Sequence, residues 1–447
     1  MADLSAIFKA YDIRGTVPDQ LDADVTRRIG AAFARFTGAA GIVVARDMRE
    51  SGVELSRAFA EGAASQGVDV VDLGLASTDL VYYAAGKLDR PAAMFTASHN
   101  PARYNGIKLC LAGARPVGED TGLREIRGLV EEGVPATTGP EGRITESGLI
   151  DDYAAHVRSF VDRSVLRSLQ VVADTANGMG GLVVPRVFDG MPFELEILFA
   201  DLDGSFPNHP ADPIQPENLK DLQARVLERR ADVGLAFDGD ADRVFLVDER
   251  AQPVSGSLTT ALVAKAMLEK HPGAVIIHNL ICSHVVREVI LENGGTPVQT
   301  RVGHSFIKAV MADTGAVFGG EHSGHYYFRD NYRADSGLIA ALVVLELLSK
   351  AQLPLSEVLR PFDRYADSGE INTAVDDPHA VIERVASVFA DMRQERLDGL
   401  TVDGGDWWFN LRPSNTEPLL RLNLEATTRD ECDRHVDEVL AVIRGEH

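Results

Sequence analysis

The sequence predicts an α/β protein made of three wound α/β units followed by a smaller α+β unit. Short β-branched runs alternate with helix-like segments, as they do in a wound sheet. This rhythm restarts twice along the chain, and the pattern changes after about residue 364. The chain has 447 residues, and at roughly 100–200 residues per domain several domains are expected.

The first unit displays the pattern most clearly. Residues 41–47 are short and β-branched, like a buried strand, and a helix-like stretch follows at 53–65. Further strands are expected at 68–73 and 92–96, with the last one ending in a polar loop. This βαβαβ order is typical of a wound α/β sheet.

The second and third units repeat this order, and the last unit departs from it. In the repeats, strands are predicted at 169–174, 194–199, 233–237, 274–278, 296–301 and 316–318, and helices at 181–188 and 217–230. The last unit combines strands at 370–375, 407–411 and 419–424 with helices at 379–392 and at the C-terminal end. Boundaries near residues 148, 250 and 364 divide the chain into 1–148, 149–250, 251–363 and 364–447.

Composition and charge argue against several classes of function. The formal net charge is −23, so we expect no nucleic-acid partner and no anionic lipid surface. The three cysteines are far apart and form no C-x-x-C pair, which favours reduced thiols and a cytoplasmic location. The N-terminus lacks the pattern of a signal peptide. The longest apolar run, 337–345, is too short to span a bilayer and is expected to form a buried helix.

One polar loop in each unit is expected to bind a ligand. The loops cover residues 96–101, 238–243, 320–325 and 412–418, and each follows a predicted strand. Because ligands of open α/β sheets bind outside the carboxyl ends of strands, the four loops could converge on one central cleft. Their contents complement one another, since they offer a hydroxyl, a carboxylate cluster, a hydrogen-bonding set and a phosphate clamp.

The second loop carries Asp238, Asp240 and Asp242 at alternating positions. Three carboxylates at this spacing are hard oxygen ligands that suit Mg²⁺ or Ca²⁺, and they would repel one another without a cation. A calcium EF-hand is disfavoured because Arg243 stands where that loop needs glycine, although Glu249 falls at its twelfth position. A solvated acidic turn is the other alternative, and a bound cation explains the cluster better.

Ser98 is the candidate nucleophile in the first loop. The segment ends a strand and turns at Asn100 and Pro101. A turn serine that only hydrogen-bonds its own backbone is the alternative. We expect the side chain of His99 to point away from Ser98, because neighbouring side chains diverge on an extended segment. No G-x-S-x-G elbow surrounds the serine, so a protease-like triad is weakly supported.

The third and fourth loops have the composition of binding loops. Residues 321–325 offer a carboxylate, a hydroxyl and two imidazoles, without the H-E-x-x-H pattern of zinc enzymes. Residues 412–416 combine a guanidinium, two hydroxyls and an amide, which is the composition of a phosphate site. A type I turn is the alternative reading of that loop. The sequence has no Walker A motif and no G-x-G-x-x-G, so a nucleotide fold is not indicated.

Together the four loops resemble those of the α-D-phosphohexomutases, the superfamily of phosphomannomutase, phosphoglucomutase and phosphoglucosamine mutase. All four motifs occur in the family's order, and residues 11–15, 105–108 and 203–209 also resemble family segments. The resemblance therefore covers nearly the whole chain. It implies a monomer of four domains, with a dimer as the alternative. Three domains would hold related mixed α/β sheets, and a C-terminal α+β domain would resemble the TATA-binding protein.

The resemblance also implies a role for each loop. Ser98 would carry the phosphoryl group, and it would join Asp238, Asp240 and Asp242 as ligands of Mg²⁺. The implied substrate-binding residues are Arg243, Glu321, Ser323, Arg412, Ser414, Asn415 and Thr416. The residues that resemble those steadying charge or moving protons are Arg14, Lys108, His304 and His325. A hexose 1,6-bisphosphate is implied as intermediate and activator.

The loop variants favour the phosphomannomutase/phosphoglucomutase branch. Phosphoglucosamine mutases usually carry Gln where His322 stands and Gly where Asn415 stands. Ile281 occupies a position where some dual-specificity members carry lysine, so the sugar contacts of those members do not carry over directly. We expect interconversion of mannose 1- and 6-phosphates with acceptance of glucose phosphates. Phosphoglucomutase or phosphoglucosamine mutase activity is the alternative.

Three other functions are alternatives to this one. A metal-dependent phosphatase or sulfatase would use Ser98 as a nucleophile and pass its intermediate to water. A haloacid-dehalogenase-type enzyme would phosphorylate Asp238, but the loop lacks the Thr or Val that usually follows in that pattern. A non-catalytic sugar-phosphate-binding protein is disfavoured because the loop set is complete.

Overall fold

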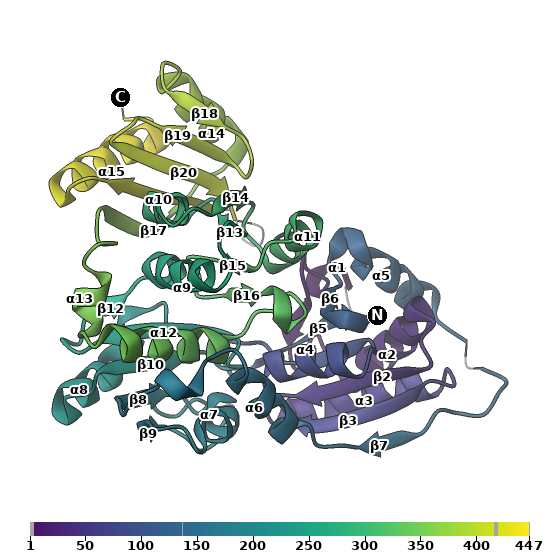
Figure 1. Ribbon diagram of the computed structural model, residues 1–447. Helices are drawn as coiled ribbons and strands as arrows, with labels where there is room; N and C mark the ends of the chain where they lie inside the picture. The colour runs from purple at the N-terminus through teal and green to yellow at the C-terminus, as the bar shows by residue number, and fades with distance from the viewer. Residues whose placement is uncertain (1–3, 136, 415–418, 447) are drawn as a thin grey trace.

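Four β-sheets follow one another along the chain (Figure 1). The computed structural model describes residues 4–135, 137–414 and 419–446, apart from the side chains of residues 304 and 305. Each sheet lies mainly within one predicted unit. The boundaries themselves stay predictions, and a short strand at Pro253–Val254 pairs with the second sheet across the boundary at residue 250.

The first sheet mixes parallel and antiparallel strands. Its strands are β1 (Ile13–Thr16), β2 (Gly41–Arg46), β3 (Asp69–Leu75), β4 (Ala92–Phe95), β5 (Tyr104–Leu111), β6 (Arg115–Pro116) and β7 (Ile144–Glu146). The strand order is β1-β5-β4-β2-β3-β7, with β6 beside β5. β5 returns antiparallel to β4. The sequence pattern does not predict β5, because Asn105 and Gly106 are unfavourable in strands and leave only a short alternating stretch.

The two faces of the first sheet belong to different hydrophobic cores. The helices of this unit are α1 (Leu4–Ile7), α2 (Ala23–Thr37), α3 (Ser51–Ala64), α4 (Thr78–Lys87) and α5 (Leu123–Glu132). Ile42 and Val44 of β2 share a core with α2, α3 and α5. Val43 and Ala45 point to the opposite face and join a core that contains α4 and continues through the second and third sheets.

The second sheet is a mixed sheet whose central strand is completely buried. Its strands are β8 (Gln170–Asp174), β9 (Glu194–Leu198), β10 (Val233–Phe237), β11 (Val244–Asp248) and β12 (Pro253–Val254), in the order β12-β11-β10-β8-β9. Its helices are α6 (Ile150–Arg158), α7 (Gly180–Phe188) and α8 (Lys220–Arg229). β10 runs parallel to β8 and antiparallel to β11, so the turn from β10 to β11 is a short loop at one edge.

The third unit combines a mixed sheet with a helix that is apolar along most of its length. Its strands are β13 (Val275–Asn279), β14 (Thr296–Thr300), β15 (Phe318–Gly320) and β16 (Tyr326–Phe328), in the order β14-β13-β15-β16. Its helices are α9 (Gly256–Lys270), α10 (His284–Glu292), α11 (His304–Thr314), α12 (Gly337–Ala351) and α13 (Leu355–Leu359). The apolar run 337–345 is completely buried in α12, as predicted. None of the described helices combines the length and the apolar character needed to cross a membrane.

The last sheet is antiparallel and has its own core. Its strands are β17 (Ala366–Ala374), β18 (Arg393–Glu395), β19 (Leu400–Asp403), β20 (Trp407–Pro413) and β21 (Leu419–Ala426), in the order β17-β21-β20-β19-β18. Alternate residues of β20 and β21 pack against α14 (Pro378–Val388) and α15 (Arg429–Arg444) in a core separate from the others. In Figure 1 this unit stands at the top, away from the first sheet.

The start of helix α4 ties the first three units together. The buried carboxylate of Asp79 accepts hydrogen bonds from Tyr153 of α6 and, at 2.7 Å, from Ser336, the residue that caps α12. The neighbouring Thr78 hydroxyl donates to Asp240 Oδ2 at 2.6 Å. The aspartate loop of the second unit is therefore fixed by a helix end of the first.

Candidate active site

Ser98 lies where the first unit meets the second. β4 ends at Phe95, and the chain kinks at Ser98, whose φ of 50° is a left-handed conformation that few non-glycine residues adopt. The Ser98 hydroxyl donates a hydrogen bond to Asp238 Oδ2 at 2.7 Å. The serine predicted as nucleophile thus contacts the predicted metal loop directly.

Asp238, Asp240 and Asp242 converge at the end of β10. They can offer one carboxylate oxygen each within 4.8 Å of one another, and all three side chains are buried. Burial raises the pKa of Asp238 to about 7, the guanidinium of Arg243 opposes this shift, and the other two carboxylates add to it. Three carboxylates this close resist full ionisation unless positive charge is brought to them.

Lys108 of β5 supplies part of this positive charge. Its Nζ lies 2.8 Å from Asp240 Oδ2 and 2.7 Å from Asp242 Oδ2. Burial alone would raise the pKa of Asp240, yet the Lys108 ammonium holds that pKa below its ordinary value. The strand that the sequence pattern does not predict therefore delivers a predicted site residue to the aspartates.

The remaining carboxylate oxygens fit a hard divalent cation. Asp240 Oδ1 and Asp242 Oδ1 are buried, and no described residue hydrogen-bonds to either. Buried polar atoms in native proteins are normally paired, so such oxygens indicate a ligand. Together with Asp238 they form an all-oxygen donor set of the kind that Mg²⁺ and Ca²⁺ prefer. The acidic loop could therefore bind a metal ion.

Arg243 connects the metal loop to the serine. Its Nε donates to Asp238 Oδ2 at 2.9 Å, and its Nη2 lies 3.3 Å from Ser98 Oγ. The same Nη2 lies 2.7 Å from His99 Nδ1. Arg243, predicted to bind substrate, thus already contacts both the nucleophile and a metal-loop carboxylate.

The expectation that His99 points away from Ser98 is wrong. The kink at Ser98 turns the two neighbouring side chains together, and Ser98 Oγ lies 3.3 Å from His99 Nδ1. Burial and then the Arg243 guanidinium lower the pKa of His99 well below its usual value. The neutral ring therefore accepts a hydrogen bond from Arg243, while the serine hydrogen goes to Asp238.

Sequence reasoning missed Arg49, whose guanidinium binds the backbone of the serine loop. This arginine is 1% exposed, and its guanidinium donates to the carbonyl oxygens of Ser98, Asn100, Pro101 and Tyr104 at 2.7–3.2 Å. Its Nε donates to Asp47 at the end of β2. The sequence did offer a signal, because Asp47 and Arg49 stand two residues apart directly after a predicted buried strand. Charged side chains at such a place are expected to pair with each other or with buried polar groups.

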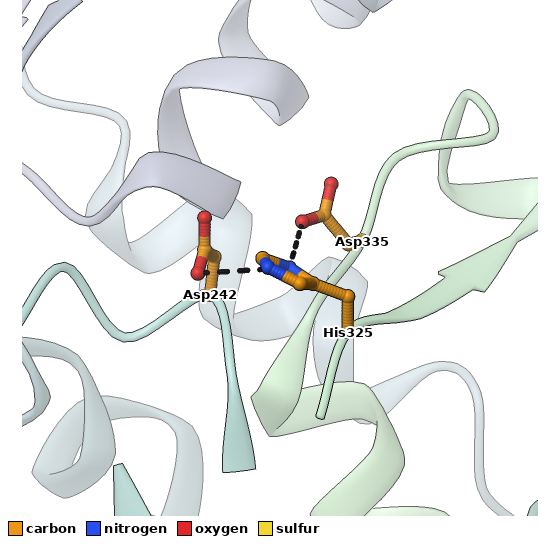
Figure 2. Close-up of side chains that lie close together, drawn as sticks. All are labelled: Asp242, His325 and Asp335. Atoms are coloured by element: carbon orange, nitrogen blue, oxygen red, sulfur yellow. Dashed lines mark hydrogen bonds and ion pairs between the residues drawn. The ribbon is translucent and has the colours of Figure 1, made fainter. Parts of the chain in front are cut away.

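Two of the predicted charge-handling residues border this centre. Arg14 donates to Asn100 Oδ1 at 2.5 Å and pairs with Asp12. His325 Nδ1 lies 3.9 Å from Asp242 Oδ1 (Figure 2). The side chains of both are about one-fifth exposed, unlike the aspartates. His304 begins α11, and its side chain lies outside the described part of the structure.

The third loop keeps its carboxylate buried. Glu321 Oε1 accepts from Asn279 Nδ2 at 3.2 Å and from the Gly303 amide at 3.1 Å, and its Oε2 accepts from Tyr327 at 2.7 Å. An ionised carboxylate has about four acceptor sites, so these three bonds leave little capacity for a sugar hydroxyl. Ser323, on the same loop, is half-buried.

The fourth loop makes its ion pair within its own unit and not with Ser98 or the aspartates. Arg412 pairs with Glu370 at 2.8 Å, and no hydrogen bond or ion pair between described residues joins Arg412 to Ser98 or to the three aspartates. Asn415 and Thr416 lie outside the described residues. The structure thus brings three of the four loops into contact, whereas Arg412 of the predicted phosphate clamp pairs within its own unit.

A second arginine beside this loop was not predicted. Arg421 is the register partner of Arg412 across β20 and β21, contacts Glu370 at 3.2 Å, and lies 3.4 Å from Ser414 Oγ. The Nε atoms of Arg412 and Arg421 are buried and meet no hydrogen-bond partner among the described residues. An anion between the two guanidinium groups would satisfy both. Alternation along β21 was the signal that could have found Arg421.

Comparison with known proteins agrees with this arrangement. Family models described as phosphoglucomutase/phosphomannomutase match the chain in four consecutive parts: α/β/α domain I at 5–135, domain II at 151–252, domain III at 255–365 and the C-terminal domain at 370–442. The chain is 41% identical to a phosphomannomutase of Salmonella montevideo over 432 residues, 94% of each chain.

Two further relatives match over almost their full length. A protein of Xanthomonas campestris named phosphohexose mutases is 40% identical over 445 residues, 98% of this chain and 99% of that one. The crystal structure of a phosphoglucomutase/phosphomannomutase family protein from Burkholderia thailandensis is 34% identical and superposes with a TM-score of 0.91, covering 99% of this chain and 98% of the other. The chain therefore belongs to the phosphoglucomutase/phosphomannomutase family, the α-D-phosphohexomutases.

Proposed function

We propose that this phosphohexomutase interconverts mannose 1-phosphate and mannose 6-phosphate through a phosphorylated Ser98, and also accepts glucose phosphates. The observation that carries the proposal is the hydrogen bond of 2.7 Å from Ser98 Oγ to Asp238, inside a cluster that also holds Lys108 and Arg243. The names of the relatives from Salmonella montevideo and Escherichia coli support mannose as the sugar.

The proposed reaction has two transfers with balanced bonds. In the first, the free hydroxyl of a hexose monophosphate attacks phosphoserine, so that a new O–P bond forms as the Ser98 Oγ–P bond breaks. The hydroxyl proton passes to a base, and Ser98 Oγ leaves with the bonding electron pair and takes a proton from solvent. The hexose 1,6-bisphosphate then turns round, and its other phosphate returns to Ser98 by the same changes in reverse. No water is consumed.

Phosphoryl transfer needs mainly in-line positioning of the reacting groups and neutralisation of the negative charge on the transferred phosphoryl group. Lys108 and Arg243 are the groups that we assign to this task, because both already contact the aspartates around Ser98. Arg14, which holds the serine loop through Asn100, would steady the incoming phosphate. We assign proton transfer to His325, the partly exposed imidazole beside Asp242.

Mg²⁺ would be held by Asp238, Asp240, Asp242 and an oxygen of phosphoserine 98. The two orphaned carboxylate oxygens described above support this assignment. A bound Mg²⁺ would neutralise the negative charge that develops on the transferred group. Hexose 1,6-bisphosphate would act as the activator that loads Ser98 with its first phosphoryl group.

The proposed sugar and phosphate contacts come from the other two loops. Glu321 would use its remaining acceptor capacity on a sugar hydroxyl, and Ser323 would bind beside it. The phosphate that is not being transferred would bind at Arg412 and Ser414, with Asn415 and Thr416 completing the clamp. The unsatisfied Nε atoms of Arg412 and Arg421 support an anion at this place. A cytoplasmic monomer, with a dimer as the alternative, stays a prediction.

A coupled assay tests the proposal. Mannose 1-phosphate and glucose 1-phosphate are supplied in turn with Mg²⁺ and a trace of glucose 1,6-bisphosphate, and the hexose 6-phosphate formed is measured. We expect turnover of both sugars, dependence on the bisphosphate, and a loss of several orders of magnitude in Ser98→Ala. Release of inorganic phosphate in place of hexose 6-phosphate would favour a phosphatase and contradict the proposal.

A further inference from the structure

A buried carboxylate, Asp335, lies next to the imidazole of His325 (Figure 2). It lies in the segment between β16 and α12, and its backbone forms an antiparallel bridge with Tyr327, two residues after His325. The next amide, that of Ser336, donates to the Tyr326 carbonyl at 2.9 Å. The carboxylate and the imidazole are therefore fixed to each other by the backbone.

Asp335 and His325 share a hydrogen bond that determines which ring nitrogen carries the hydrogen. His325 Nδ1 lies 2.8 Å from Asp335 Oδ2. An ionised carboxylate can only accept, so Nδ1 must be the donor and the neutral ring keeps its lone pair on Nε2. Nε2 forms no hydrogen bond with any residue that the structure describes, and the side chain is about one-fifth exposed. The lone pair of Nε2 is thus left for another partner.

A buried lysine holds Asp335 from its other side. Lys308 of α11 is 3% exposed, and its Nζ lies 3.2 Å from Asp335 Oδ1. The same Nζ lies 3.6 Å from the centre of the Tyr82 ring on α4. The ammonium favours the ionised carboxylate, and the aromatic face compensates part of its desolvation. The order is therefore Tyr82, Lys308, Asp335 and His325, running from the first unit into the third.

The same residues could be taken for a second metal site, and the lysines argue against it. Asp242, His325 and Asp335 can offer ligand atoms within 4.8 Å of one another. However, Lys308 Nζ already lies 3.2 Å from Asp335, and Lys108 Nζ lies 2.7 Å from Asp242. Asp335 thus has the Lys308 ammonium as its cation, and Asp242 belongs to the acidic loop assigned to the first metal ion, so a further ion would meet positive charge on both sides.

We propose that Asp335 is a positioning residue that acts through His325, fixing the ring and keeping its hydrogen on Nδ1, so that Nε2 faces the hexose hydroxyl as the proton acceptor. Lys308 holds the carboxylate in this position. The inference rests on the proposed function, because it assigns the proton taken from that hydroxyl to Nε2. It adds two residues to the reaction, and neither belongs to any of the four loops.

Asp335→Asn tests the proposal because the amide keeps the size of the side chain and can donate to Nδ1, which would move the ring hydrogen to Nε2. We expect kcat to fall by about 10²–10⁴-fold, the range for losing a general base. KM should change little, since the interaction acts on the transition state and not on sugar binding. The conservative Asp335→Glu should recover part of kcat if its carboxylate reaches Nδ1.

A double-mutant cycle separates a positioning role from a structural one. In a His325→Ala background, Asp335→Asn should cause almost no further loss of kcat, because the residue through which it acts is gone. Asp79→Asn is the matched control, since Asp79 is equally buried and is bonded to Ser336, next to Asp335. Its effect should add to that of His325→Ala. An additive effect of Asp335→Asn would overturn the proposal.

The third measurement uses the wild-type enzyme and therefore does not depend on any variant folding. The protein is labelled with ¹⁵N-histidine, and the His325 signals are assigned by their absence in His325→Ala. At a pH where the ring is neutral, the ¹⁵N shifts should report hydrogen on Nδ1 and none on Nε2. The opposite tautomer would overturn the inference. Absence of hexose phosphate turnover in the wild type would instead reject the proposed function, while this reading of the Asp335–His325 pair would still stand.

Discussion

At the level of single residues, the site around Ser98 is governed by the balance of charge. Three aspartates face the two cationic side chains of Lys108 and Arg243, which leaves one uncompensated negative charge when all are ionised. A phosphoserine would add about −1.5 to −2 at pH 7. A divalent cation would compensate that addition, which is a physical reason for the predicted metal loop and a phosphoserine to share one place.

Asp240→Asn should weaken Mg²⁺ binding and turnover together. The change removes one anionic ligand and also a partner of Lys108, so both the charge and the geometry of the site suffer. Titration calorimetry with Mg²⁺ gives the affinity, and the coupled assay gives kcat. Asp221→Asn, an exposed aspartate on α8 of the same unit, is the control and should leave both values unchanged. Full activity of the wild type in chelator would contradict the metal assignment.

Arg412→Ala should impair every phosphosugar to a similar degree. The side chain is assigned to the phosphate that is not being transferred, and not to the sugar ring. The fall in kcat/KM should therefore correspond to a loss of about 2–5 kcal/mol in transition-state binding, for mannose and glucose phosphates alike. Parallel assays with both sugars measure this. Arg444→Ala, exposed at the end of α15, serves as the control. A loss confined to one sugar would make Arg412 a specificity residue.

At the scale of elements, the serine loop has the shape it has because Arg49 holds it. Four carbonyl oxygens of the loop and of the start of β5 point at one guanidinium, which in turn pairs with Asp47. The ring of Phe206, from the second unit, lies over this guanidinium at 5.1 Å. The left-handed φ of Ser98 is thus stabilised by the Arg49 guanidinium, which a side chain of the second unit covers.

Arg49→Met should destabilise the protein and lower turnover together. The substitution leaves Asp47 buried without its cation, and breaking such a pair costs about 3–5 kcal/mol of unfolding free energy. Arg49→Lys keeps the charge but lacks the planar fork that reaches several carbonyls, so its kcat should fall while less stability is lost. Urea unfolding and the coupled assay measure the two effects. Arg46→Met, on the neighbouring β2, is the control; equal effects at both positions would contradict the assigned role.

The elements that the sequence predicted are those with an uninterrupted local pattern. β2, β10 and α12 are apolar and buried along most of their length, so their residue types alone indicate them. β5 and β19 are absent from the prediction because their local patterns are weak: β5 contains Asn105 and Gly106, which are unfavourable in strands, and β19 alternates over only four residues. Pairing with neighbouring strands stabilises both. The same limit applies to the site. Asp238 and Ser98 stand in local motifs, whereas Arg49, Arg421 and Asp335 act through contacts distant in sequence.

For the molecule as a whole, the distribution of cores matters most. The first three units share one core, which fixes the serine, metal and sugar loops relative to one another. The last unit has a separate core and carries the predicted phosphate clamp. The placement of each loop after a strand predicted that all four loops converge. The position of the last unit relative to the others depends on the interface between them, which the sequence pattern does not reveal. A clamp on such a unit would suit a substrate that must bind in two orientations.

Substrate choice follows from those two orientations. Mannose and glucose phosphates differ only in the direction of the C2 hydroxyl, so neither sugar would leave a buried hydrogen-bonding group of the site unpaired. In addition, one side chain cannot contact O2 in both binding orientations. We therefore expect a modest preference of about 10–200-fold between the two sugars. Glucosamine 6-phosphate should be a poor substrate, because no carboxylate beyond Glu321 is assigned to its ammonium. If glucosamine 6-phosphate were the fastest substrate in the coupled assay, the proposed branch of the family would be wrong.

The central claim is that Ser98 carries the phosphoryl group, and mass spectrometry of the whole enzyme tests it most directly. The protein is incubated with glucose 1,6-bisphosphate and Mg²⁺, its intact mass is recorded, and the modified peptide is sequenced. We expect the mass of one phosphoryl group on Ser98, its removal by excess glucose 6-phosphate, and no modification in Ser98→Ala. A phosphoryl group on Asp238, or full turnover with Ser98 never modified, would contradict the account.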